Sequence, residues 1–315
     1  MTIFTENVSD RLRLLPALSL FALVGLPLLL TPANGYAEDS GSWQYGWIVE
    51  PSDAEQLIAK NDLTILDARS KENYESGHIT DAIHVAWDTF TPHEASERGK
   101  LLDAKALRKK LTETGVDFEH PVLVVGQPPD GWGEAGRIVW MLRTLGHPAA
   151  ALIDGGHSAL VQAGLDTSTS EPQPEGAEVR IEETTEWLAT RREVASAIED
   201  KDWVLLDTRE RREYEGAIPY GESRGGHIPG AAHLHYRDLM NSNGRILPDT
   251  EIKRLLQERG IGPSTPVIAY CTGGVRSAWV TVVLTELGYE VKNYAGSTWE
   301  WAEYPPETHP LEQSD

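Results

Sequence analysis

The chain has 315 residues, of which 40% are hydrophobic and 24% charged, and it carries a formal net charge of −21 with an isoelectric point of about 4.8. This length suggests two domains of about 100–200 residues each. The strong negative charge argues against nucleic acid or an anionic membrane surface as a partner.

The first 37 residues predict an export signal. A short basic region from Arg11 to Arg13 precedes an apolar stretch from Leu14 to Leu30, and a small-x-small cleavage site follows at 35–37. We therefore expect an exported protein, in the bacterial periplasm, with no membrane contact after signal cleavage. The apolar stretch is at the short limit for a spanning helix, so an uncleaved membrane anchor is the alternative.

The rest of the chain repeats one order of landmarks at offsets of 140–149 residues. Each half contains an Asp-x-Arg triplet, a tyrosine, Gly-His-Ile, an apolar run after a proline, and Leu-Gly. This period is far longer than that of stacked repeats, so it predicts a duplicated domain. We place the first domain at 43–166 and the second at 179–308, with a polar, proline-bearing linker at 167–178.

Short β-branched runs alternate with helical patterns in both halves. The runs lie at 63–66, 122–125, 204–206 and 267–270, and the helical patterns at 103–112, 137–145, 250–259 and 276–287. This alternation predicts an α/β fold in which each domain has a parallel sheet with helices on both faces. Sites in such sheets form at the carboxyl ends of the strands.

The single cysteine, Cys271, stands at such an end. It follows the apolar run 266–270, and a glycine-bearing loop and an apolar helical stretch come after it. Backbone N–H groups of the loop and the positive end of the helix dipole favour a negative charge on the sulfur. We therefore expect a thiol that ionises more easily than a free cysteine, whose pKa is about 8.5.

A buried packing role is the alternative for a lone cysteine. Two consecutive glycines and the nearby Arg276, which we expect to supply a fixed cation, are not needed for packing. In an exported chain a single cysteine has no internal disulfide partner, which also favours a reactive thiol. The cradle that we expect to bind the substrate and hold the sulfur comprises Thr272, Gly273, Gly274, Val275, Arg276 and Ser277.

The duplication provides an internal control for this prediction. Asp-x-Arg and Gly-His-Ile occur in both halves, so we interpret Asp207, Arg209 and His227 as structural support. The first half has no cysteine in the corresponding loop, 126–136, which is longer by about three residues. We expect a catalytically silent first domain whose loop walls the cleft beside Cys271.

Together these landmarks resemble the tandem rhodanese family of sulfurtransferases, from about Trp47 to Tyr304. The resemblance rests on Asp-x-Arg followed by Gly-His-Ile-Pro-Gly-Ala, on the Cys-x-x-Gly-x-Arg loop, and on the Gly-Ser-Thr-Trp-Glu-Trp run at 296–301. It implies two similar domains and a persulfide intermediate on the cysteine of the second. The partners it implies are a small anionic sulfur donor, thiosulfate or 3-mercaptopyruvate, and a thiophilic acceptor such as cyanide or a thiol.

One position departs from the family pattern. The substrate-binding arginine of the family falls on Glu213, which leaves specificity for thiosulfate open. Arg211, Arg212 and Arg224 are candidates to replace it, although each also suits a solvated surface position. The Thr-Gly-Gly sequence after the cysteine is nearer the pattern of mercaptopyruvate-specific members. We expect no cofactor, and no His/Cys spacing suggests a metal.

Two alternative functions remain at this point. A cysteine phosphatase also places a thiolate and an arginine on an anion-binding loop, but related folds need five residues between them, and this chain has four. A persulfide carrier that serves a dedicated partner protein needs the same loop as the enzyme. The sequence does not identify a protein acceptor.

Overall fold

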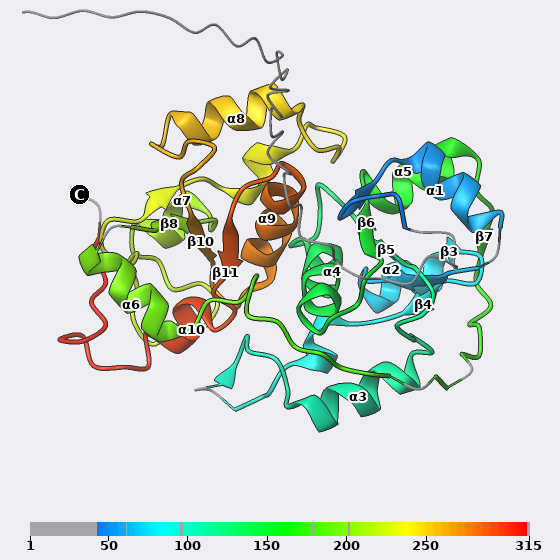
Figure 1. The fold of residues 1–315 in the computed structure, drawn as a ribbon, viewed down its shortest axis with the longest axis horizontal. Helices are drawn as coiled ribbons and strands as arrows, with labels where there is room; N and C mark the ends of the chain where they lie inside the picture. Colours follow the sequence, from blue (N-terminus) through cyan, green and yellow to red (C-terminus); the bar gives the residue numbers. More distant parts are fainter. Residues whose placement is uncertain are drawn as a thin grey trace, which may run out of the picture. The chain divides into compact units, whose positions relative to one another are not determined.

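The computed structural model describes residues 43–60, 62–94, 97–174, 176–177, 179–200 and 202–313 (Figure 1). The predicted export signal at 1–37 lies outside these residues. Within the described ranges, no helix is both long and apolar enough to cross a membrane.

The elements of the two halves follow each other in nearly the same order. In the first half these are β1 (Ile48–Val49), α1 (Pro51–Ile58), β2 (Thr64–Asp67), α2 (Lys71–Ser76), β3 (His78–Ile79), β4 (Ile83–His84), η1 (Trp87–Phe90), α3 (Ala104–Glu113), β5 (Val122–Val125), α4 (Glu134–Thr144), β6 (Ala150–Ile153), α5 (Gly156–Ala163) and β7 (Thr167–Ser168). In the second half they are α6 (Arg191–Asp200), β8 (Val204–Asp207), α7 (Arg211–Tyr214), β9 (Ala232–His233), η3 (Tyr236–Leu239), α8 (Asp249–Gln257), β10 (Val267–Tyr270), α9 (Val275–Glu286), β11 (Val291–Asn293) and α10 (Ser297–Trp301).

Each half forms one parallel sheet, and the two sheets have matching strand orders. The first is β1-β6-β5-β2-β4 and the second β11-β10-β8-β9. A single parallel bridge between Leu188 and Asn293 stands where β1 pairs with β6 in the first half. The duplicated α/β fold predicted from the repeat is confirmed.

Helices cover both faces of each sheet because the central strands are apolar on both sides. In β5, Val122 and Val124 pack in one core cluster with α3 and α4, whereas Leu123 and Val125 pack in another with α1 and α5. In β10, alternate residues likewise pack with α8 and α9 on one face and with α6 and α10 on the other. Strands buried on both faces are continuous apolar runs, as these are.

Helices α4 and α9 pack against each other and join the two halves in one hydrophobic core (Figure 1). Both helices begin after a glycine with left-handed backbone, Gly133 with φ 83° and Gly274 with φ 76°. Gly136 of α4 lies against Trp279 of α9 so closely that a side chain would meet its backbone at 2.5 Å.

The first two residues of the predicted linker, Thr167–Ser168, form strand β7, which pairs antiparallel with β3. Their polar composition gave no sign of this pairing. The domain boundaries stay predictions.

Candidate functional site

The thiol of Cys271 lies at the carboxyl end of β10 and directly before the loop that opens α9. Its side chain is buried, with an exposed fraction of 1%. The N–H of Gly274 donates a hydrogen bond to Sγ at 3.1 Å, and the hydroxyl of Ser277 lies 3.5 Å from the same atom. The loop therefore wraps around the sulfur and directs donors toward it.

These contacts favour the thiolate. Burial alone would raise the pKa of Cys271, but the charge of Arg276 and hydrogen bonds from Ser277 and the Gly273 N–H outweigh burial and lower the pKa. The direction is the one expected from the strand–loop–helix pattern. The thiolate, and not the thiol, is the nucleophilic form of cysteine.

Ser297 supports the loop from the start of α10. Its hydroxyl accepts a hydrogen bond from the Cys271 N–H at 3.0 Å and donates one to the Tyr294 carbonyl at 2.7 Å. Its backbone has a φ of 51°, which is uncommon for a residue other than glycine. The equivalent position in the first half is a glycine, Gly156, with φ 55°. Sequence reasoning noted Ser297 only as part of the family resemblance and missed this role.

Arg276, which the sequence suggested as a fixed cation, lies in the cradle and is paired with a carboxylate, a pairing that the sequence did not indicate. Its Nη1 and Nη2 donate to the two carboxylate oxygens of Glu213 at 2.6 and 2.8 Å. The Thr272 hydroxyl also donates to Glu213, at 2.6 Å. Glu213 is fully buried, and although burial would raise its pKa, hydrogen bonds and charge from Arg276 lower it. Both side chains are therefore ionised, and the net charge of the Arg276–Glu213 pair is zero.

The three arginines considered as replacements lie elsewhere. Arg211 and Arg212 are exposed and pair with Glu215 and Glu210 of their own helix region. Arg224 donates to backbone carbonyls near the C-terminal end of the second domain, among them those of Ala302 and His309. None of these contacts involves the cysteine loop.

The remaining predicted cradle residues lie where the spacing places them. Gly274 is the N-cap of α9 and Val275 its first residue. Gly273 lies under Trp299, so that a side chain there would come within 2.2 Å of the ring. The single hydroxyl proton of Ser277 lies closer to the Asn293 Oδ1, at 2.7 Å, than to Cys271 Sγ, so Asn293 is its main acceptor in this state.

The residues predicted as structural support form the same contacts in both halves. Arg209 pairs with Asp207 at 2.6 Å and donates to the Gly226 carbonyl, and the His227 ring stacks on Tyr214 at a centroid distance of 3.7 Å. In the first half, Arg69–Asp67 and His78–Tyr74 repeat this arrangement. These contacts hold the turns that follow β2 and β8 and are not specific to the half that has the cysteine.

Three aromatic side chains lie over the cradle. Tyr220, from the segment that is inserted in the second half, has its ring 5.6 Å from the Arg276 guanidinium, and Trp132 of the first domain lies 5.9 Å from it. Trp299 donates from Nε1 to the Tyr220 carbonyl at 3.0 Å. The loop of the first half thus reaches the cysteine site, as predicted for a cleft wall.

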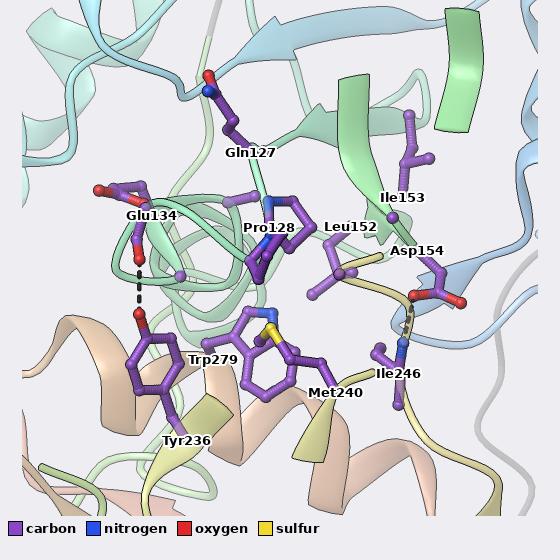
Figure 2. A pocket seen from close by; sticks show the side chains of 17 residues that line it. Gln127, Pro128, Glu134, Leu152, Ile153, Asp154, Tyr236, Met240, Ile246 and Trp279 are labelled. Carbon is purple, nitrogen blue, oxygen red and sulfur yellow. Dashed lines mark hydrogen bonds between the residues drawn. The ribbon is translucent and has the colours of Figure 1, made fainter. Parts of the chain in front are cut away.

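The first domain has its own pocket at the equivalent loop, and Figure 2 shows its lining. Gly126 directly follows β5, as Cys271 follows β10. Trp279 of α9 and Tyr236 of η3 line this pocket from the second domain, and the Tyr236 hydroxyl donates to the Gly131 carbonyl at 2.5 Å. The lining contains neither cysteine nor serine.

No group of three or more His, Cys, Asp or Glu side chains in the described part of the chain is arranged to hold a metal ion. The arrangement around Cys271 can do one kind of chemistry on its own: it can hold a thiolate, or a sulfur atom attached to it, among fixed N–H and hydroxyl donors.

Comparison with known proteins places these features in a family. The model of the family described as "Rhodanese-like domain" matches residues 50–163 and 190–304. A thiosulfate sulfurtransferase of Pseudomonas aeruginosa is 30% identical over 82% of this chain and 94% of its own length. The 3-mercaptopyruvate sulfurtransferase of Homo sapiens is 26% identical over 81% of this chain and 89% of its own.

Solved structures give the same fold. The chain is similar to SseA from Escherichia coli, described as a 3-mercaptopyruvate sulfotransferase with the "Rhodanese" fold, with a TM-score of 0.70 and 22% identity. That match covers 80% of this chain and 99% of SseA.

Proposed function

The chain belongs to the rhodanese-like domain family, with two copies of the domain, and from this premise we propose that it is a sulfurtransferase that carries sulfane sulfur as a persulfide on Cys271. The observation that carries the proposal is the buried thiol with a lowered pKa, to which Gly274 and Ser277 direct donors. Relatives named for two sulfur donors cover most of the chain.

The reaction consists of two displacements at sulfur. The Cys271 thiolate attacks the outer sulfur of the donor and forms an S–S bond, and the bond between that sulfur and the rest of the donor breaks. With thiosulfate, sulfite leaves with the bonding electron pair; with 3-mercaptopyruvate, the enolate of pyruvate leaves with that pair and takes up a proton, for which the donor's own thiol proton accounts. A thiophile such as cyanide then attacks the outer sulfur of the persulfide, forms thiocyanate and returns the thiolate. No cofactor or external oxidant enters this balance.

The same donors serve both states of the cysteine. A persulfide carries its negative charge mainly on the outer sulfur, one atom further from Cα than in the thiolate. The Gly274 N–H stabilises charge at the inner position, and a Gly-rich loop of backbone N–H groups is a general way to hold a further anionic atom such as the outer sulfur. Because the donors are fixed before the reaction, they need no reorganisation as charge moves.

The two donors place different demands on the charge of the cradle. Thiosulfate is a dianion, whereas 3-mercaptopyruvate has a single carboxylate that stays charged throughout. The Arg276–Glu213 pair offers no net positive charge. We therefore propose 3-mercaptopyruvate as the better donor, with thiosulfate as a slower one.

Intact mass spectrometry tests the proposal. The protein is mixed with thiosulfate or with 3-mercaptopyruvate and freed of excess donor. We expect a species one sulfur atom heavier, absent from the Cys271→Ala variant. Failure of both donors to add sulfur to folded protein would overturn the sulfurtransferase proposal.

A carrier that delivers persulfide to a partner protein is the second candidate. The observation in its favour is the burial of Cys271 in a loop that Trp299 covers at Gly273, since slow exchange with free acceptors suits storage. Steady-state assays with thiosulfate and cyanide separate the two. Continuous sulfite release favours the enzyme, and release that stops after one equivalent favours the carrier.

We also propose that the chain is exported, because a basic region, an apolar stretch and a small-x-small site follow each other in its first 37 residues. Cell fractionation with N-terminal sequencing tests this. A chain that begins after Ala37 in the periplasmic fraction is expected. A full-length chain in the membrane fraction supports the anchor instead.

A further inference from the structure

The buried charges around Cys271 almost all occur in neutral pairs. Arg276 pairs with Glu213, and Arg209 pairs with Asp207, and in both pairs the side chains have exposed fractions of 5% or less. Arg276 still lowers the pKa of Cys271 through its charge, but the Arg276–Glu213 pair as a whole adds no net charge to balance a buried thiolate. An isolated buried anion is costly unless a cation or fixed donors compensate it.

Arg137 is a buried cation of a different kind. It belongs to α4 of the first domain, and its exposed fraction is 1%. Nη2 donates to the Gly99 carbonyl at 2.6 Å, and the guanidinium stacks on Trp140 at 4.7 Å. Among the described residues no carboxylate pairs with it, and the opposite charge that acts on it is the thiolate of Cys271.

One residue links Arg137 to the thiol directly. Nη1 of Arg137 donates to the Gly274 carbonyl at 3.2 Å, and the N–H of the same glycine donates to Cys271 Sγ at 3.1 Å. The fit is close, since a side chain on Gly274 would meet the Ala295 carbonyl at 2.4 Å and Arg137 Nη1 at 2.9 Å. The guanidinium therefore contacts the cysteine loop from the side of the first domain and holds Gly274, the residue that caps α9.

We propose that Arg137 of the catalytically silent domain is the cation that balances the Cys271 thiolate and its persulfide, acting as a positioning residue through Gly274. This inference rests on the proposed function and deepens it. The first domain then does more than wall the cleft. The buried arginines of the second domain are each paired with a carboxylate, so the net positive charge near the thiolate comes from Arg137 of the first domain.

The titration behaviour of the two groups agrees with this geometry. Burial lowers the pKa of Arg137 to about 9, and the Cys271 thiolate acts in the opposite direction, favouring the charged guanidinium. Coupling between two sites is reciprocal, so the charged guanidinium must favour the thiolate to the same extent. At neutral pH the arginine remains protonated.

The test is the pH dependence of Cys271 alkylation by iodoacetamide, which needs no sulfur donor. We expect Arg137→Met to raise the apparent pKa of the thiol by about one unit, so that alkylation below that pKa slows about tenfold. Arg137→Lys keeps the charge and is expected to retain most of the wild-type titration. The matched control is Arg143→Met on the same helix, since Arg143 donates to the Ala150 and Gly46 carbonyls and its charge partner is Glu286.

A second variant and a measurement at higher pH separate a charge effect from a folding defect. Arg137→Gln, which is neutral but still donates to a carbonyl, repeats the test if Arg137→Met does not fold. Persulfide loading by 3-mercaptopyruvate in the neutral variants should recover at pH 9.5, where the thiolate forms regardless, and a purely structural defect would not recover. A folded neutral variant with the wild-type titration would overturn the inference, and failure of wild-type protein to load sulfur would overturn the proposed function instead.

Discussion

At the residue scale, Glu213 determines how much positive charge the cradle presents to an anionic donor. Its carboxylate accepts hydrogen bonds from Nη1 and Nη2 of Arg276 and from the Thr272 hydroxyl. Burial of all three side chains makes the network rigid and strong. The identity of the residue at this one position should therefore change donor preference more than the loop sequence itself.

Replacing Glu213 with Gln tests this directly. The amide keeps the shape and some of the hydrogen bonds but leaves the Arg276 charge uncompensated. We expect kcat/KM for thiosulfate, relative to 3-mercaptopyruvate, to rise about tenfold, which corresponds to about 1.4 kcal/mol. Glu215→Gln removes the same charge from an exposed site and serves as control. An unchanged ratio in folded Glu213→Gln protein would contradict this role.

At the element scale, β10, the cysteine loop and α10 form one unit. The loop is held at its start by Ser297, which accepts from the Cys271 N–H, and the Thr298 N–H donates to the Cys271 carbonyl at 3.2 Å. Ser297 keeps a left-handed backbone although a glycine would adopt it at lower cost. The hydroxyl is the reason to keep serine there, because the buried N–H would otherwise lack an acceptor.

Two substitutions at Ser297 separate the hydroxyl from the backbone. Ser297→Ala loses the acceptor and keeps the strain, and we expect it to lower stability by about 1–3 kcal/mol. Ser297→Gly loses the same acceptor but relieves strain worth about 1 kcal/mol, so it should be the more stable of the two. Urea unfolding of both variants gives the order. If Ser297→Ala equals or exceeds Ser297→Gly in stability, the strain is absent.

At the scale of the whole molecule, the α4–α9 contact makes the two domains one functional unit. It brings Arg137 into contact with the cysteine loop and Trp279 into the pocket of the first half. The contact is close because Gly136 has no side chain at the crossing. The loop 126–136 of the first half thus lies against α9, and the cysteine loop of the second half lies against α4. Of these two loops, the second carries the cysteine nucleophile.

Gly136→Ala should weaken this contact. The added methyl group would lie 2.5 Å from Trp279 Cα, and backbone at that position cannot rotate away. We expect a loss of about 1–3 kcal/mol in the free energy of unfolding. Gly262→Ala, where the new atom would meet only the Thr265 hydroxyl at 3.6 Å, is the control. A variant as stable as this control would show that the helices can separate without cost.

The fold could be predicted from the sequence because strand and helix patterns are local. The runs 122–125 and 267–270 coincide with β5 and β10, and the pattern 276–287 nearly matches α9. Helix α4 begins three residues before its predicted start, since the glycines near Gly136 interrupt the helical pattern.

Contacts between distant residues could not be predicted in this way. Arg276 and Glu213 are 63 positions apart, and Arg137 and Gly274 are 137 apart. No periodicity links such positions, so the neutral pair in the cradle and the cation beneath the loop emerge only when the sheets are assembled. The sequence did indicate that Glu213 departs from its family, but not what it contacts.

The half-reaction of loaded enzyme tests the central claim most directly. Protein treated with donor is freed of it by gel filtration and then mixed with cyanide alone. A persulfide on Cys271 predicts one equivalent of thiocyanate per chain and recovery of the free thiol, with none from Cys271→Ala. Thiocyanate that forms only while donor is present would mean that sulfur passes directly from donor to acceptor, and it would contradict the account.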